Sequence, residues 1–309
     1  VGLYVPAGSA PLFSTVLMLA LPAKIAGVGE IVLCSPAGKD GRVAPEILYA
    51  AQVCGVDKIY KLGGAIAVGA MAYGTESIAK VDKIFGPGNQ YVTTAKQLVS
   101  LFDVAIDMPA GPSEVLVLAD KSADPAFTAS DLLSQAEHGT DSQAILITDN
   151  FDFALAVQSE VFTQIKKLSR AEIAEKAVEK SRIIVVDSPE RMVELSNRYA
   201  PEHLIISMRD AEQVARRIEA AGSVFIGNYT PESAGDYASG TNHTLPTSGW
   251  ARSYSGVNLD SFTKKITYQH ISPEGLKTLG PVIETMAAGE GLDAHKNAVT
   301  IRLASLKNE

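Results

Sequence analysis

Short apolar runs and helical segments alternate along most of this 309-residue chain, and this alternation limits the folds that the chain can adopt. The apolar runs are nearly continuous in hydrophobic residues, which is typical of strands buried on both faces of a sheet. They are residues 30–36, 57–63, 81–88, 102–108, 114–120, 142–149, 182–188, 203–210 and 222–228. Helical segments lie between most of them, including 44–55, 89–100, 189–200 and 210–222. Strands that alternate with helices predict βαβ units and parallel sheets, and therefore an α/β protein.

The alternation forms one series up to about residue 110 and a second series that follows, so we expect a domain boundary within 108–114. Residues 231–249 are rich in Gly, Ser and Thr and lack a hydrophobic period, which predicts a loop. Loops of that length are usually functional or disordered. Helical patterns return before the end of the chain and indicate an appended arm. The predicted organisation is a first domain at 1–111, a second domain at 112–241, and a C-terminal linker and helical arm at 242–309.

The charge and cysteine content exclude several classes of function. The formal charge is −8 and no cluster of Lys and Arg is present, which argues against nucleic acid as a partner. The most apolar stretch, 16–28, contains Pro22 and Lys24 and is too short to span a bilayer. Cys34 and Cys54 lie inside apolar runs, without a Cys-x-x-Cys pair. We therefore expect buried free thiols in a reducing, cytoplasmic setting, with no membrane partner.

Residues 134–139, "SQAEHG", end a segment with the pattern of an amphipathic helix, 124–139. Gln135 and His138 are three residues apart and share one helix face, and Gly139 looks like the C-cap. The spacing alone leaves three interpretations open: a metal site, an acid–base site, or a polar helix end.

The chain has five histidines and no local His-x-x-x-His or Cys-rich signature, so a metal site must be assembled from distant segments. The candidate segments are 134–139, 200–206, 232–243 and 292–298. Each of them places a polar residue at the end of an element or in a loop, where α/β proteins carry their chemistry. The alternative for each histidine is a helix cap or a surface residue.

Glu202 and His203 follow Pro201 directly and precede a buried strand. An adjacent carboxylate and imidazole at the mouth of a strand can serve general acid–base catalysis near neutral pH. The alternative is a turn between a helix and a strand that carries two solvated polar residues.

Residues 81–96 predict a strand, a Gly-Pro-Gly-Asn turn and a helix, and a helix N-terminus can bind a phosphate group. The dinucleotide fingerprint is incomplete, because Tyr91 stands where the third glycine of G-x-G-x-x-G belongs. A tight packing turn explains the pattern equally well.

Six blocks of this sequence, taken together and in this order, resemble the histidinol dehydrogenase family across the whole chain. They are residues 86–96, 106–120, 131–139, 200–206, 232–247 and 294–306. The resemblance implies an α/β fold with two incomplete Rossmann-like domains, parallel sheets, and a C-terminal helical arm that is exchanged in a homodimer. Members of the family carry a further N-terminal segment that helps to complete the second domain. We therefore expect this chain to lack such a segment.

The resemblance also implies an enzyme that contains zinc and uses NAD. Such an enzyme oxidises L-histidinol to L-histidine through histidinal, in two hydride transfers, as the last step of histidine biosynthesis. Matched motif by motif, the zinc ligands are Gln135, His138, Asp236 and His295, and the zinc ion orients the substrate. By the same matching, His203 is the base on the alcohol, and Glu202 activates the water that hydrates the aldehyde.

Further contacts follow from the same resemblance. Ser113 and Glu290 are expected to touch the substrate, as are His203 and the four zinc ligands. Tyr4 and Asn89 are expected to touch NAD. With an exchanged arm, Glu290 and His295 complete the site of the partner subunit.

The sequence departs from the family pattern on the cofactor side. The family usually has Gln where this chain has Ile66, and it usually has Pro-Gly-Gly where residues 6–8 are Pro-Ala-Gly. Both changes bear on cofactor affinity and leave the zinc ligands and the catalytic pair intact.

Two other functions remain open on the sequence. One is a zinc hydrolase with Glu202 as its base, since zinc and a carboxylate also support hydrolysis. The other is a two-lobed binding protein without catalytic activity. His243 can either contact the substrate or order its loop, and we interpret His270 as structural.

Overall fold

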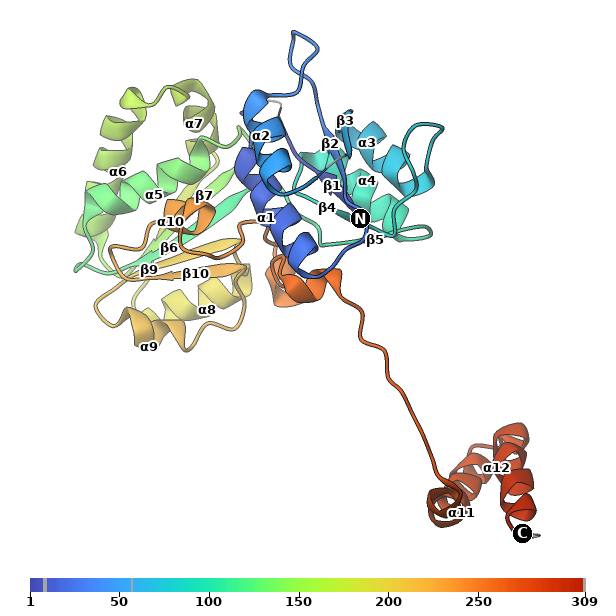
Figure 1. The fold of residues 1–309 in the computed structure, drawn as a ribbon. Helices are drawn as coiled ribbons and strands as arrows, with labels where there is room; N and C mark the ends of the chain where they lie inside the picture. Colours follow the sequence, from blue (N-terminus) through green and yellow to red (C-terminus); the bar gives the residue numbers. More distant parts are fainter. Residues whose placement is uncertain (8–9, 57, 308–309) are drawn as a thin grey trace. The chain divides into compact units, whose positions relative to one another are not determined.

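The computed structural model describes residues 1–7, 10–56 and 58–307, which form two compact units (Figure 1). The first unit is Val1–Thr263 and holds both β-sheets, and the second begins at Lys264. No helix in the described ranges is long and apolar enough to cross a membrane.

The first sheet has five parallel strands in the order β3-β2-β1-β4-β5. Its strands are β1 (Gly2–Tyr4), β2 (Val32–Ser35), β3 (Lys58–Lys61), β4 (Lys83–Phe85) and β5 (Ala105–Ile106). The helices that connect them are α1 (Phe13–Ile25), α2 (Pro45–Val53), α3 (Gly64–Tyr73) and α4 (Gln90–Ser100). The strand order reverses between β1 and β4, and such a switch point is where doubly wound sheets bind ligands.

The second sheet repeats this topology with five parallel strands in the order β10-β9-β6-β7-β8. Its strands are β6 (Glu114–Ala119), β7 (Gln143–Thr148), β8 (Arg182–Val185), β9 (His203–Ser207) and β10 (Ser223–Ile226). The helices around them are α5 (Pro125–Ala136), α6 (Phe151–Gln164), α7 (Ala171–Val178), α8 (Pro189–Tyr199) and α9 (Ala211–Ala215). The switch point of this sheet lies between β6 and β9.

Helices cover both faces of each sheet (Figure 1). In β6, Val115 and Val117 pack into the cluster that includes α5, α6 and α7, whereas Leu116 and Leu118 pack into the cluster that includes α8 and α9. This burial on both faces explains why the strands are nearly continuous in apolar residues. The predicted fold class, an α/β protein with two Rossmann-like parallel sheets and C-terminal helices, is confirmed.

The Asp120 side chain accepts two backbone hydrogen bonds at the carboxyl end of β6. Its Oδ1 accepts a hydrogen bond from the backbone N–H of Ser122 at 2.8 Å, and its Oδ2 accepts one from the backbone N–H of Arg209 at 3.0 Å. The two donors follow β6 and β9, so the carboxylate joins the loops on either side of the switch point.

Three local predictions need correction. The predicted loop 231–249 contains a helix, α10 (Glu232–Tyr237). The helix predicted for 210–222 is limited to α9, because the chain turns after Arg216. Helix α5 ends at Ala136 with Glu137 as its C-cap, so His138 lies in the turn beyond the helix and Gly139 is not the cap.

The rest of the chain adds short 3-10 helices and the C-terminal helices. They are η1 (Ile165–Lys167), η2 (Trp250–Arg252), η3 (Leu259–Phe262), α11 (Pro273–Gly289) and α12 (Asp293–Ser305). The predicted domains 1–111, 112–241 and 242–309 stay a prediction, although the first sheet ends at Ile106 and the second begins at Glu114.

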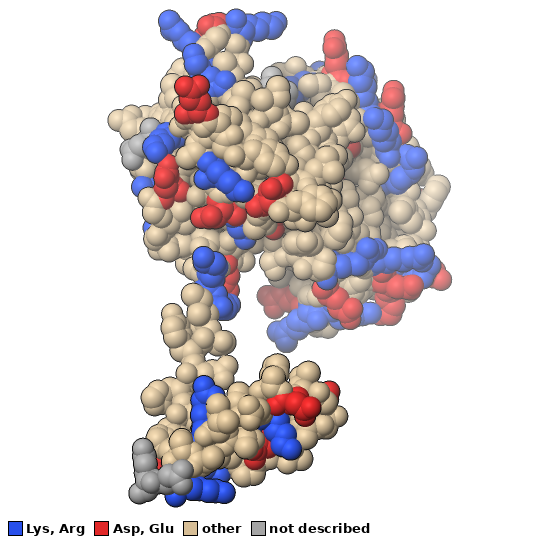
Figure 2. Space-filling view, turned by 90° about the vertical axis from the view of Figure 1, so that its right-hand side faces the viewer, with Lys and Arg blue, Asp and Glu red and all other residues tan. Residues whose placement is uncertain are grey.

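Charge and cysteine burial fit the composition. Cys34 and Cys54 are buried thiols without a disulfide. On the face in Figure 2, Lys and Arg side chains are interspersed with Asp and Glu. That nucleic acid is not a partner stays a prediction.

Candidate functional site

A cavity of about 500 Å³ in the first unit brings most of the candidate residues together. Its lining includes Tyr4, Asn89, Ser113, Gln135, His138, Glu202, His203, Glu232, Asp236 and His243. Residues that follow β1 and β4 line one side, so the first sheet contributes the carboxyl ends of its strands. The second sheet contributes the opposite edge, because Ser113 precedes β6 and Glu202 precedes β9. A cavity of this size suits a small organic ligand.

Two predicted site residues lie outside this unit. Glu290 is the C-cap of α11, and His295 lies in the first turn of α12; both side chains are exposed. Their participation in the site stays a prediction.

Gln135 and His138 reach the cavity from the end of α5. The His138 backbone N–H donates to the Gln135 carbonyl oxygen at 3.2 Å, which keeps the chain in a helix-like turn beyond Ala136. The Gln135 side chain is fully buried, and its Nε2 donates to Glu202 Oε2 at 3.4 Å, while its Oε1 has no hydrogen-bond partner among the described residues. Desolvation by the surrounding protein and the nearby Arg170 charge lower the pKa of His138, so its imidazole is neutral at neutral pH.

The Glu202 carboxylate is held from two directions. Its Oε2 accepts hydrogen bonds from the backbone N–H of Glu114 at 2.8 Å and from Gln135 Nε2. Burial raises the pKa of Glu202 well above its ordinary value, and the Glu114 and Asp236 carboxylates raise it further. A carboxyl group with a raised pKa can take up a proton near neutral pH, as a general base requires.

His203 is buried, and burial lowers its pKa to about 3, so the imidazole is neutral. Its Nδ1 lies 3.2 Å from the Glu114 carbonyl oxygen, which can only accept a hydrogen bond. The proton of the neutral ring is therefore on Nδ1, and the lone pair is on Nε2. That Nε2 is buried and has no hydrogen-bond partner in the ranges that the structure describes, so it can take a proton from a ligand.

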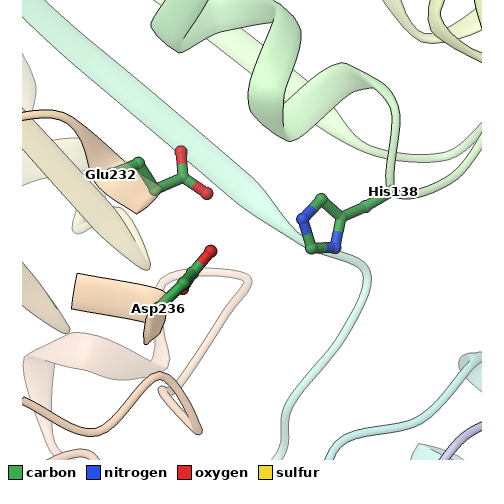
Figure 3. A group of neighbouring side chains, drawn as sticks. All are labelled: His138, Glu232 and Asp236. Atoms are coloured by element: carbon green, nitrogen blue, oxygen red, sulfur yellow. The ribbon is translucent and has the colours of Figure 1, made fainter. Parts of the chain in front are cut away.

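Glu232 and Asp236 lie on one side of α10, because they are four residues apart. Figure 3 shows both carboxylates directed toward the His138 ring. The possible ligand atoms of these three residues all lie within 4.8 Å of one another. Sequence reasoning missed Glu232. The signal was the four-residue spacing, which has a meaning only if the segment is a helix.

These residues fit a divalent cation. Within residues 1–7, 10–56 and 58–307, the buried Gln135 Oε1 and Glu232 Oε2 have no hydrogen-bond partner, and buried polar atoms normally have one. Imidazole nitrogen and carboxylate or amide oxygen are ligands that zinc accepts. Binding of a cation would satisfy these oxygens and offset the like charges of the carboxylates.

His243 lies beside Asp236 and joins the loop to α1. Its Nδ1 is 3.2 Å from the Asp236 carbonyl oxygen, and its Nε2 is 3.4 Å from Thr15 Oγ1. Both ring nitrogens thus have protein partners, which favours the interpretation that His243 orders the loop.

The cofactor candidates lie on the side of the cavity formed by the first sheet. The Tyr4 hydroxyl accepts a hydrogen bond from the Gly64 backbone N–H at 3.1 Å, and Asn89 Oδ1 caps α4 by accepting from two backbone N–H groups. Ile66 is exposed and is not part of the cavity lining. Of the turn at residues 6–8, Gly8 lies outside the described residues.

Two glycines allow close approach of the backbone in the turns beside these residues. A Cβ at Gly86 would lie 2.1 Å from the Tyr4 carbonyl oxygen, and one at Gly111 would lie 2.2 Å from the Gly88 carbonyl oxygen. Both glycines also have positive φ angles, 123° and 102°, which disfavour other residues.

A buried ion pair, Lys96–Asp107, also fixes the turn that contains Gly86. Lys96 Nζ lies 2.5 Å from Asp107 Oδ1 and donates to the carbonyl oxygens of Gly86 at 2.7 Å and Met108 at 3.3 Å. The other carboxylate oxygen, Asp107 Oδ2, accepts from the Gly86 backbone N–H at 2.7 Å. The turn that precedes Asn89 is therefore fixed before any ligand binds.

Comparison with known proteins gives one consistent result. The family model described as histidinol dehydrogenase matches residues 1–303. The histidinol dehydrogenase of Bacteroides thetaiotaomicron is 66% identical over 307 residues, which cover 99% of this chain and 72% of that relative. The histidinol dehydrogenase of Mannheimia succiniciproducens is 59% identical over 309 residues, covering 99% of this chain and 71% of the relative.

One solved structure agrees with these sequences. The crystal structure of histidinol dehydrogenase from Elizabethkingia anophelis has 58% sequence identity and a TM-score of 0.95. The match covers 99% of this chain and 71% of that chain.

Proposed function

Because the chain belongs to the histidinol dehydrogenase family, we propose that it oxidises L-histidinol through histidinal to L-histidine, using zinc and NAD. Membership makes the chain an oxidoreductase of histidine biosynthesis. One observation carries the finer proposal: a single cavity is lined by Tyr4 and Asn89 from one sheet and by Glu202 and His203 from the other.

Gln135, His138, Asp236 and His295 would hold zinc, which supplies a fixed point of attachment for the amine and imidazole of the substrate. The unpartnered Gln135 Oε1 and the neutral ring of His138 support this set. Tyr4 and Asn89 would hold NAD, which would supply the hydride acceptor for each of the two oxidations. Ser113 and Glu290 are the further substrate contacts.

His203 takes the hydroxyl proton of histidinol on Nε2, while its Nδ1–H stays on the Glu114 carbonyl oxygen. Glu202 then takes a proton from the water that adds to the aldehyde carbon, while His203 Nε2 returns its proton to the aldehyde oxygen and becomes neutral again. His203 takes the hydroxyl proton of the resulting hydrate in the second oxidation. The protein thus handles the protons: His203 serves both oxidations and Glu202 serves the hydration between them, without movement of the substrate to another site.

We also propose that two subunits exchange their C-terminal helices, so that Glu290 and His295 complete the site of the other subunit. Exposed apolar side chains on these helices support an interface with a second chain. They are Leu279, Val282, Met286 and Ile301.

The test is the yield of NADH per histidinol, measured with zinc-loaded protein and excess NAD. We expect two NADH per substrate and loss of the activity after chelation. A yield of one would mean that the aldehyde is released and that the role of Glu202 is wrong. No NADH from protein with zinc bound would contradict the oxidation and favour a hydrolase or a binding protein.

A further inference from the structure

The Glu232 carboxylate is buried without a compensating partner. Its side chain is 1% exposed, and its Oε2 accepts no hydrogen bond in the described part of the chain. Its Oε1 lies 3.9 Å from His203 Nδ1, which is beyond hydrogen-bond distance, and the His203 ring is neutral. A buried carboxylate in such surroundings is unfavourable unless a proton or a cation compensates it.

Glu232 is not needed to orient the His203 ring. The Nδ1 proton of His203 is already on the Glu114 carbonyl oxygen at 3.2 Å. Glu232 points instead toward His138 and Asp236, as Figure 3 shows. Its position therefore indicates a ligand in the cavity.

The neighbouring donors complete a set within one compact unit. The Gln135 amide donates a hydrogen bond from Nε2 to Glu202. Its Oε1 is buried and accepts no hydrogen bond from the described residues, so it is available to a ligand. All four residues line the same cavity: Gln135 from α5, His138 from the turn after α5, and Glu232 and Asp236 from α10. Two carboxylates match the charge of a divalent cation, whereas the set with His295 has only one.

We propose that Glu232 is a further ligand of the divalent cation, so that residues of Val1–Thr263 alone hold the cation when His295 is not in place. The inference rests on the proposed function and extends it to the substrate-free state. In this state Gln135, His138, Glu232 and Asp236 bind the ion. Arrival of His295 then changes the ligand set instead of creating the site.

The experiment measures Co²⁺ binding to the full chain after removal of metal. The variants are Glu232→Gln, His295→Ala, the double variant, and Glu137→Gln as a matched control. Glu137 is the sequence neighbour of His138 but lies outside the ligand group. The readouts are Co²⁺ per chain, the dissociation constant by competition with a chelator, and the visible absorption spectrum of bound Co²⁺.

We expect His295→Ala to keep one Co²⁺ per chain and Glu137→Gln to bind like the unchanged protein. Glu232→Gln should weaken binding about tenfold or more in the His295→Ala background and change the spectrum. If Glu232→Gln does not fold by circular dichroism, Glu232→Asp keeps the charge but retracts the oxygen, and it should shift the spectrum. Unchanged affinity and spectrum in the folded Glu232 variant would overturn the inference.

The inference and the proposed function fail in different ways. Unchanged Co²⁺ binding by Glu232→Gln, with histidinol oxidation that still stops on chelation, would overturn the role of Glu232 alone. Histidinol oxidation by unchanged protein that binds no cation would overturn both the inference and the zinc dependence of the proposed function.

Discussion

Two ion pairs of nearly equal length provide a test of how burial controls their strength. Lys96 and Asp107 are 2.5 Å apart, and their side chains are 2% and 0% exposed. Lys58 and Glu30 are 2.6 Å apart, and their side chains are 53% and 54% exposed. The perturbation is Lys96→Met, with Lys58→Met as the matched control.

The expected loss in the free energy of unfolding depends on whether the remaining partner of each pair is buried or solvated. Lys96→Met removes the ion-pair partner of the buried Asp107 carboxylate and the donor to the Gly86 and Met108 carbonyl oxygens. Breaking such a buried pair costs about 3–5 kcal/mol in the free energy of unfolding. Lys58→Met removes a solvated pair, and solvent-exposed ion pairs contribute little to stability.

The assay is denaturant unfolding of the full chain at one pH and at two salt concentrations. Added salt should shrink the effect of Lys58→Met and leave the effect of Lys96→Met unchanged, because a buried pair is poorly screened. In a double-mutant cycle with Asp107→Asn, the double variant should lose less stability than the two single losses combined. A loss below about 1 kcal/mol for Lys96→Met, or strict additivity, would refute the reasoning.

Three further predictions concern the site. His203→Asn should lower turnover by about 10²–10⁴-fold while zinc content and NAD affinity stay normal, and unimpaired turnover would remove His203 as the base. Mixing unfolded His203→Asn and His295→Ala chains and refolding them together should restore activity through mixed dimers, and no recovery would contradict the exchanged helices. Burial raises the pKa of Glu114 from 4.5 to about 7, so between these pH values the folded state holds a proton that the unfolded state has released. Stability should therefore fall as the pH rises through this window, by about 3 kcal/mol from this group. In Glu114→Gln this share of the pH dependence should disappear, and an unfolding curve with the same pH slope as the unchanged protein would show that Glu114 is not its source.

The strands could be predicted from the sequence because their signal is local. A strand buried on both faces must be apolar at nearly every position, as in β6 and β9, and no knowledge of distant residues is needed to see this. Each predicted run contains one strand of the structure. The alternation of strands and helices was then enough to predict two parallel sheets.

Helix α10 could not be predicted in the same way. Its sequence is rich in small residues and carries little hydrophobic pattern, and its position is fixed by packing. The Phe225 ring leaves room only for a hydrogen at Gly235, since a Cβ there would lie 2.7 Å from the ring. Without the helix, Glu232 and Asp236 are merely two acids in a loop, which is why Glu232 was missed.

The convergence of the site is a tertiary property. Gln135 and Glu202 meet through a side-chain hydrogen bond although 67 residues separate them, and Glu114 meets His203 across 89 residues. The motifs indicated which residues carry chemistry, but the shared cavity follows from strand order. It also follows from the use of opposite edges by the two sheets.

The carboxylate of Asp120 limits what the carboxyl edge of the second sheet can bind. In a doubly wound sheet, the carboxyl edge at the switch point offers free backbone N–H groups to the phosphates of a nucleotide. Asp120 already occupies the N–H groups of Ser122 and Arg209, so it acts as an internal counterpart of a phosphate. A nucleotide would have to displace this resident anion. The cavity lies instead beside the opposite edge of this sheet, where Ser113 and Glu202 precede β6 and β9.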